Sequence, residues 1–473
     1  MTLVPTWFDG SDERTRPRLV LIATSLGVLF AQIDTSVVNL ALKSIGADLH
    51  AGVSEMQWVI DSYNLAYASL LLTAGTLGDL YGRRRIFVLG IVMFIVGTLI
   101  CALAPNAATL ISGRIVSGIG AAFEVPMSLV LLTLAFPDRN QRTHALGVWA
   151  SCNALAFIVG PMIGGWLVDT VGWRSIFYVI LPVCAAAVAL TYVAIRESAE
   201  PNGRALDLPG QTLAIVGLSA FAFAAIEGSY WGWGSPLILL IVGIALTAFV
   251  LFVWVEARTP GPMLPLQFLR RPVFSAALAA AGLMTFGIYA LLFVMPLYFQ
   301  TVRGASPLTA GLELLPMPMS FFVVSQLAGH LNRRLGPRVL MTVGMACMGA
   351  GALSLAFIDE GTSFVFIEIA LLVIGVGLGL NTAPVNGVAV AALPPERSGT
   401  ASGVLNTSRM VGATLGVAIL GAAFAVHAGQ NAAAGSGFLP GLRAALIGSG
   451  VAEFVGAVIA FSFIRHDSLH AKQ

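Results

Sequence analysis

The sequence predicts an all-α integral membrane protein that crosses the bilayer fourteen times. Of its 473 residues, 57% are hydrophobic and only 10% are charged, whereas soluble proteins carry about 25% charged residues. Fourteen apolar runs are also long enough to cross a hydrocarbon core as helices, which takes about 20 residues each. The surroundings of most of the chain are therefore lipid, and a net charge of +2 gives no reason to expect a nucleic-acid partner.

The first apolar run follows a polar stretch that ends at Arg18. It lacks the short apolar core and the small-residue cleavage site of a signal peptide, so we count it as a spanning helix. The predicted spans lie near residues 19–41, 55–77, 86–104, 109–133, 143–168, 175–195, 210–230, 236–256, 273–299, 307–329, 339–358, 364–390, 402–426 and 441–464.

The distribution of basic residues predicts the orientation. With the N-terminus in the cytoplasm, nineteen of the 25 Lys and Arg residues fall on the cytoplasmic side and two, Arg114 and Arg409, fall within spans. The outer side holds only Lys43, Arg174, Arg303 and Arg443. Cytoplasmic loops are enriched in Lys and Arg, and a wrong helix count would destroy the asymmetry. We therefore expect a bacterial cytoplasmic membrane protein with both termini inside.

An internal repeat predicts the domain organisation. Gly75, Leu77, Gly82 and Arg84 match residues 254 positions later, and Pro126, Pro137, Asp138 and Arg139 match residues 258 positions later. Repeated halves around a central site are a common plan of secondary transporters. The predicted parts are a cytoplasmic tail (1–18), a six-helix half (19–200), two inserted helices (201–260), a second six-helix half (261–466) and a C-terminal tail (467–473).

The loop after the second span carries the most specific signal, formed by Gly78, Asp79, Gly82, Arg83 and Arg84. Glycine permits a tight turn between two helices. Asp79 can pair with Arg83 or face a helix N-terminus, where negative charge is favoured. A simple basic anchor for the membrane surface is the alternative. The repeat has Arg333 in place of Asp79, which leaves a gating function of the second copy in doubt.

The fifth span carries the second strong signal, Gly160, Pro161, Gly164 and Gly165. Proline removes a backbone hydrogen bond and permits a bend, and glycines let a neighbouring helix pack closely. The alternative is an ordinary seam of small residues.

These two motifs resemble the signature loop of the major facilitator superfamily and the antiporter motif of drug:proton exchangers, apart from Ala156 at the leading glycine position. The segment Arg114–Ala122 is similar to the family's buried-arginine motif, which is associated with proton coupling. With the fourteen helices, Asp34–Leu42 and Trp58–Tyr63 resemble the fourteen-helix drug:proton antiporters. Three further segments closely resemble methylenomycin A resistance-type exporters: Phe223–Gly228, Ala310–Met317 and Val404–Arg409. The resemblance implies two six-helix major facilitator halves, a monomer, a loop that latches the cytoplasmic side, and a fifth helix that seals an interface.

Three ionisable residues lie at one depth. Asp34, Asp61 and Arg114 are each five to eight residues from the outer end of their span, which is roughly 8–12 Å at about 1.5 Å per residue. Charged residues inside a membrane are costly and mark functional sites. We expect a proton-coupling site in which Arg114 holds one acid ionised while the other acid takes up a proton. A purely structural polar pair is the alternative.

Glu124 lies ten residues past Arg114 and therefore about 15 Å deeper, at the level of Arg409 in the other half. We expect Glu124 either to pair with Arg409 when the cytoplasmic side closes, to contact substrate, or to take a proton itself. Each residue satisfying its own half is the alternative. Glu453, near the middle of the last span, is ranked low as a substrate residue.

The remaining candidates concern substrate. Aromatic residues of central helices are expected to line a drug cavity, with ordinary packing as the alternative for each one: Tyr63, Phe123, Phe157, Phe286 and Tyr289. The four cysteines are scattered in apolar runs, and no histidine lies deep in a span. We therefore expect no disulfide, no metal site and no enzymatic centre.

The sequence as a whole predicts proton-driven export of antibiotics or other hydrophobic small molecules. The energy source would be the proton motive force, with no cofactor, since the chain lacks a nucleotide-binding GxxxxGK[ST] loop. An exporter of one endogenous metabolite is the close alternative, and an importer on the same fold has less reason to carry the Gly160–Pro161 motif.

Overall fold

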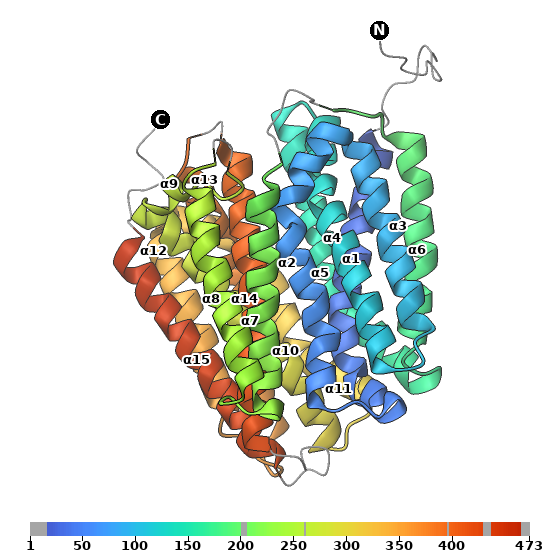
Figure 1. Cartoon of the computed structure of the whole chain (residues 1–473), viewed down its shortest axis with the longest axis vertical. Coiled ribbons are helices and arrows are strands. Elements are labelled where there is room, and N and C mark those ends of the chain that lie inside the picture. The colour runs from blue at the N-terminus through green and yellow to red at the C-terminus, as the bar shows by residue number, and fades with distance from the viewer. Residues whose placement is uncertain (1–16, 200–205, 260–261, 395–396, 429–436, 465–473) are drawn as a thin grey trace.

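The computed structural model describes residues 17–199, 206–259, 262–394, 397–428 and 437–464, and its helices run side by side in one bundle (Figure 1). Within these described residues, twelve stretches are long and apolar enough to span a membrane. One of these, Pro307–Leu355, makes two passes because Gly336 (φ 79°) turns the chain. The helix Val53–Tyr81 adds another pass between two of the twelve. Together they give the fourteen passes that the sequence predicts. The predicted tails lie almost wholly outside the described residues.

The first half of the bundle contains six helices, which Figure 1 shows in blue to teal. They are α1 (Pro17–Leu49), α2 (Val53–Tyr81), α3 (Arg83–Ala102), α4 (Ala107–Ala135), α5 (Arg139–Thr170) and α6 (Ser175–Ala194). Consecutive helices alternate in direction because short loops join them. We call the face where α1 begins and α15 ends the terminal face, and the other the opposite face.

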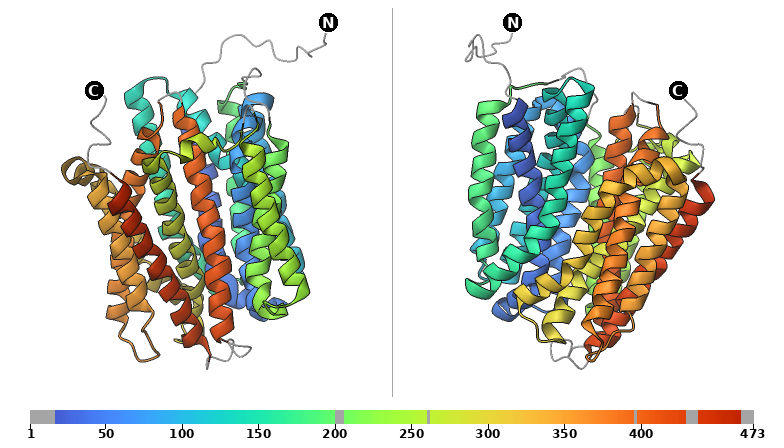
Figure 2. Two further views of the ribbon diagram at one scale, coloured as in Figure 1. Left: turned by 60° about the vertical axis from the view of Figure 1, so that its left-hand side comes forward. Right: turned by 180° about the vertical axis from the view of Figure 1, so that it is seen from behind.

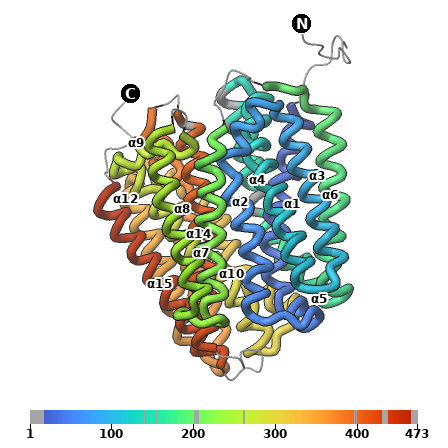
Figure 3. Tube along the Cα trace, in the orientation of Figure 1, coloured from blue at the N-terminus to red at the C-terminus, as the bar shows by residue number. Residues whose placement is uncertain are grey.

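The second half repeats this plan after a short helix, α9 (Leu266–Leu269). Its helices are α10 (Pro272–Thr301), α11 (Pro307–Leu314), α12 (Pro316–Leu355), α13 (Phe364–Ala391), α14 (Ser398–Ala428) and α15 (Phe438–Phe463). The tube in Figure 3 shows the two halves side by side. The predicted repeat is visible in the backbone, because Gly82 and Gly336, 254 residues apart, both have positive φ between two helices.

Between the halves, α7 (Leu208–Trp231) and α8 (Pro236–Glu256) form the predicted insertion. Helix α7 packs along both α2 and α14. Its polar contacts go to α2: Gln211 donates to the Ser69 carbonyl (2.5 Å) and Glu227 accepts from Trp58 (2.9 Å). Against α14 it packs small apolar residues such as Ala222 and Ala225. Helix α7 is thus tied to α2 by hydrogen bonds and packs on α14 through apolar residues.

The hydrophobic core joins the two halves at one face and divides at the other. Toward the opposite face, one cluster contains residues of both halves, including Leu40 of α1 with Phe293 and Tyr298 of α10. Toward the terminal face the core splits into two clusters, one built mainly around Phe87 and one around Phe274. Figure 2 shows the same arrangement from behind, with α11 reaching under the first half. The bundle is therefore closed at the opposite face.

Candidate functional site

The centre of the first half holds a buried ion pair. Arg114 of α4 is 2% exposed, and its Nη1 donates to Oδ2 of Asp34 in α1 (2.5 Å), which is 1% exposed. The Arg114 Nε donates to the Val59 carbonyl of α2 (3.0 Å), and the guanidinium lies 4.4 Å from the Tyr63 ring centroid. The pair thus links α1, α2 and α4, as the common depth of Asp34 and Arg114 predicts.

Asp61 lies apart from this pair. It is fully buried, and neither of its carboxylate oxygens has a hydrogen-bond partner among the described residues. Gln57, one turn earlier, donates to the Val417 carbonyl of α14 (3.3 Å), so Asp61 lies on the face of α2 directed at α14. Thr414, on the same face of α14 as Val417, also has a buried hydroxyl with no partner in that part of the chain. Asp61 therefore belongs to the contact between halves.

Glu124 lies inside the first half. Its carboxylate sits directly over Gly27 of α1, where a Cβ would overlap Oε1, and next to the Phe87 ring of α3. Its backbone packs on Gly90 of α3, where a Cβ would lie 2.7 Å from the Glu124 nitrogen. Both carboxylate oxygens are buried without a hydrogen-bond partner among the described residues. The Glu124 carboxylate is therefore enclosed between α1, α3 and α4.

Arg409, the other member of the hypothesised pair, is in α14. Its Nη1 donates to Oδ1 of Asn406 (3.4 Å), while Nε and Nη2 have no partner within the described residues. Glu124 and Arg409 are thus not paired in this structure, which is divided at the face where the pair was expected to form on closure. The pairing stays a prediction.

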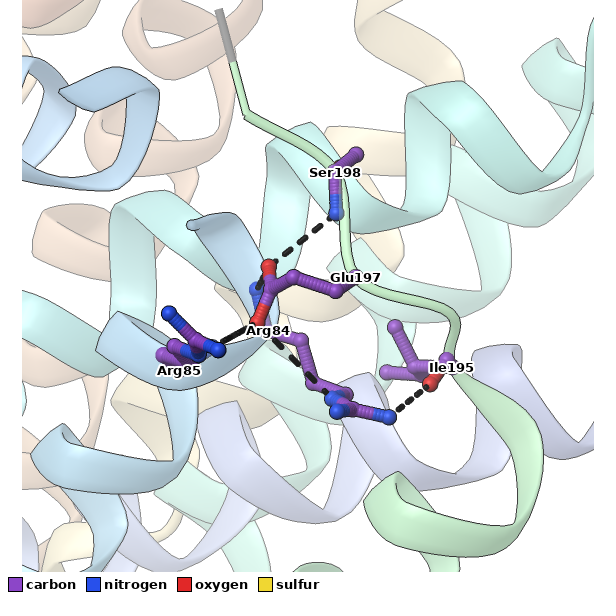
Figure 4. A network of polar contacts seen from close by, with 5 residues as sticks. All are labelled: Arg84, Arg85, Ile195, Glu197 and Ser198. Carbon is purple, nitrogen blue, oxygen red and sulfur yellow. Dashed lines mark hydrogen bonds and ion pairs between the residues drawn. The ribbon is translucent and has the colours of Figure 1, made fainter. Parts of the chain in front are cut away.

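The loop between α2 and α3 folds as a compact turn at the terminal face. Asp79 pairs with Arg83 (2.8 Å), one of the two arrangements that the sequence suggested. The N-terminus of α3 is capped instead by Glu197, which follows α6 and accepts from the backbone nitrogens of Arg84 and Arg85 (3.1 Å each), as Figure 4 shows. A Cβ at Gly82 (φ 108°) would lie 2.6 Å from this carboxylate. The glycine therefore makes room for the cap.

The glycines of the fifth span lie at the closed face. Gly160 and Gly164 pack on Ser36 and Val37 of α1. Gly165 faces α11, where a Cβ would be 2.6 Å from the Leu308 Cα, and Gly311 of α11 packs on the Pro161 carbonyl. Asp169 completes the junction by accepting from the Ser306 hydroxyl (2.8 Å) and the Leu308 nitrogen (3.0 Å). The motif thus joins the two halves as well as α1.

The predicted aromatic lining divides into two groups. Tyr63 is buried beside Arg114, whereas four others are half-buried. Of these, Phe123 packs on the terminal-face cluster of the first half, and Phe286 and Tyr289 on the cluster shared by both halves. The fourth is Phe157 of α5. Contact with substrate stays a prediction for all of them.

Comparison with known proteins identifies the family. Residues 24–417 match the Major Facilitator Superfamily. The chain belongs to this superfamily. The multidrug resistance protein Stp of Mycobacterium tuberculosis is 39% identical over 86% of this chain and 76% of its own length. The methylenomycin A resistance protein of Streptomyces coelicolor is 37% identical over 85% of this chain and 84% of its own.

Solved structures agree on the major facilitator fold. The crystal structure of a POT family transporter in complex with a thioalcohol conjugated peptide superposes with a TM-score of 0.68, covering 93% of this chain and 95% of that one. At 13% sequence identity, this likeness concerns the fold alone. The sequence-based assignment to the superfamily is therefore confirmed by both the matches and the architecture.

Within this major facilitator fold, the second half offers a comparison for the buried position of Glu124. Gly344, 254 residues after Gly90, packs on Asn381 as Gly90 packs on Glu124. Asn381 therefore occupies the position of Glu124 in the second half, and Met284 lies beside it as Gly27 lies beside Glu124. The Asn381 Nδ2 contacts the Sδ atoms of Met284 (3.5 Å) and Met345 (2.8 Å). The first half therefore places an acid where the second half places a neutral amide, and a glycine provides the space.

Glu453 of α15, which the sequence ranks low as a substrate residue, lies inside the second half. It is buried, both its oxygens lack a hydrogen-bond partner among the described residues, and it faces Gly287 of α10, where a Cβ would lie 2.5 Å from Oε1. Its depth in the span was the only available signal. The second half thus has its own buried acid.

Proposed function

We propose that this chain is a proton-driven exporter of antibiotics or other hydrophobic small molecules, working by alternating access in the bacterial cytoplasmic membrane. The buried Asp34–Arg114 pair carries the proposal. Charged residues inside a membrane are costly and therefore mark functional sites. The relatives support the direction of transport, since one is named a tetracenomycin C resistance and export protein (Streptomyces glaucescens, 31% identical over 89% of this chain).

We place the terminal face in the cytoplasm, because Lys and Arg concentrate there. The closed opposite face is then the outer side, and the structure corresponds to a state that is shut to the outside. Opening the outer side requires α5 and α11 to separate at Gly165 and Gly311. The glycines let α5 and α11 pack closely when the outer side is closed. Because they have no side chains, nothing has to be repacked when the outer side opens.

We assign proton coupling to two sites, one within the first half and one at the contact between the halves. Asp34 and Arg114 lie within one half, so protonation of Asp34 would release the guanidinium without moving the halves. Asp61 lies where α2 meets α14, so a proton there changes the charge of the contact between halves. Each proton that enters contributes about 2.3 kcal/mol per 100 mV of membrane potential. No cofactor is needed, and a monomer suffices.

The substrate class rests on the relatives and on the half-buried aromatic residues. Export of one endogenous metabolite is the second candidate, because the same site would serve it. Expression in a bacterial host that lacks its own pumps tests the proposal against a panel that includes puromycin, methylenomycin A and tetracenomycin C. The expected result is at least a fourfold rise in inhibitory concentration for some compounds, lost with Asp34→Asn. Unchanged susceptibility to all of them favours the metabolite.

Glu124 gives a separate prediction about proton transfer. If Glu124 releases and rebinds a proton during the cycle, Glu124→Gln keeps the protein folded but lowers transport at least tenfold, because glutamine fills the seat over Gly27 without titrating. Transport by purified protein in vesicles and thermal stability are measured together. Full activity of Glu124→Gln would show that Glu124 serves packing alone.

A further inference from the structure

We propose that the first turn of α3 and the end of α6 form a binding site for one anionic phospholipid. The site is a cavity of about 340 Å³ lined by Arg84, Arg85, Val88, Leu89, Val92 and Tyr192. It lies on the periphery of the first half near the terminal face, away from the buried charges and the α5–α11 junction. A site for such a lipid requires a charged end for the head group and an apolar end for the acyl chain, and the cavity has both.

The apolar end follows one stripe of α3. Arg84, Val88 and Val92 are each four residues apart and therefore share a face. They cover about 12 Å along the helix at about 1.5 Å per residue. Leu89 and Val92 are 44% and 43% exposed, and Tyr192 across the cavity is 60% exposed. The cavity thus leads from the membrane surface toward the hydrocarbon core, as the upper part of an acyl chain does.

The charged end carries more positive charge than its one carboxylate, Glu197, can balance (Figure 4). Glu197 is occupied by three backbone nitrogens, those of Arg84, Arg85 and Ser198. Arg84 donates to the Ile195 carbonyl (3.1 Å). The Arg85 side chain is 76% exposed and makes no hydrogen bond within the described residues; its Nε is 3.7 Å from Glu197. Two guanidinium groups and a helix N-terminus therefore face a single carboxylate.

This charge pattern suits a phosphodiester. Guanidinium groups bind phosphate oxygens through paired N–H donors, and basic pockets between transmembrane helices bind anionic lipid head groups. A free phosphate would satisfy Arg85 but would leave the stripe of Val88, Leu89 and Val92 unused. A zwitterionic lipid would fill the stripe but bring an ammonium group to a positive site. An anionic phospholipid matches both ends.

The internal repeat separates this site from ordinary packing. Arg338 corresponds to Arg84 and stacks on Phe461 (4.2 Å), as Arg84 stacks on Tyr192 (5.7 Å). The arginine–aromatic contact is thus common to both halves. The position of Arg85 is taken by Val339 in the second half. The second half thus forms the same turn without a cation at this position, and Arg85 is the basic residue that only the first-half site carries.

The test is lipid binding to the purified full-length protein, followed by native mass spectrometry and thermal unfolding. Phosphatidylglycerol, phosphatidylcholine and inorganic phosphate are titrated separately. We expect phosphatidylglycerol to bind with preference and to raise the Tm. Arg85→Gln should weaken it about fivefold, the contribution of one basic side chain at an anionic surface. Val92→Trp should weaken it as well, by filling the apolar end.

Two further variants keep the experiment decisive. Arg334→Gln removes another exposed arginine of the same face and should leave binding unchanged, and Val339→Arg should create a second site. Equal binding of phosphatidylglycerol by Arg85→Gln and the parent protein would overturn the proposal. So would equal stabilisation by phosphatidylcholine, or full competition by inorganic phosphate, which would identify the occupant as a free anion.

Discussion

Replacing Arg114 with glutamine is expected to abolish transport and to lower the free energy of unfolding by about 3–5 kcal/mol, the cost of removing one partner of a buried ion pair. Asp34 is left buried with one oxygen that already lacks a partner among the described residues, and the hydrogen bond to the Val59 carbonyl is lost. Thermal unfolding of the purified protein and drug uptake by inverted vesicles measure the two effects.

A second substitution separates stability from coupling in the same pair. Asp34→Asn combined with Arg114→Gln leaves no buried charge, so much of the stability should return while proton-coupled transport stays absent. The matched control is Arg174→Gln, which breaks the exposed pair with Asp48 (2.6 Å) and should cost about 1 kcal/mol or less. Coupled transport by the double variant would remove Asp34 and Arg114 from the mechanism.

Gly165→Leu is expected to lower transport more than tenfold by preventing closure of the opposite face. Its Cβ would lie 2.6 Å from the Leu308 Cα, a backbone atom that cannot move aside as a flexible side chain can. A cysteine in place of Leu40, buried beneath the junction beside Gly311, should react with an impermeant maleimide in this variant and stay protected in the parent.

The control for that experiment is on the same helix. Gly147 has nothing within 4 Å of its ideal Cβ position, so Gly147→Leu should preserve transport and protection of the reporter. If Gly165→Leu transports normally with the reporter still shielded, the α5–α11 junction does not act as the outer seal.

The sequence predicts how deep each ionisable residue lies in the membrane, but it does not predict on which side of its helix the residue lies. Counting residues from the span ends placed Asp34 and Arg114 at one level, and the structure pairs them. The same count grouped Asp61 with them, but its side of α2 depends on how α2 packs on α14. Glu124 shows the same limit, because its carboxylate fits only where Gly27 of α1, 97 positions away, leaves space for it.

For the glycine motifs, the sequence predicts close packing but not the residues against which the glycines pack. Gly160 to Gly165 predicted close helix packing, and the structure confirms it. That Gly165 meets Leu308 of the other half could not be predicted, since only the relative placement of the halves determines it. The turn at Gly336 likewise follows from the repeat of Gly82, since both glycines have positive φ between two helices.

The central claim is that drug export and proton entry are one coupled cycle, and purified protein in liposomes with an imposed pH gradient tests it most directly. A pH-sensitive dye inside the vesicles reports proton flux while the drug panel is added. The account predicts proton movement that requires an effective compound and is absent with Asp34→Asn. Drug movement without any proton flux, or proton flux that Asp34→Asn leaves intact, would contradict it.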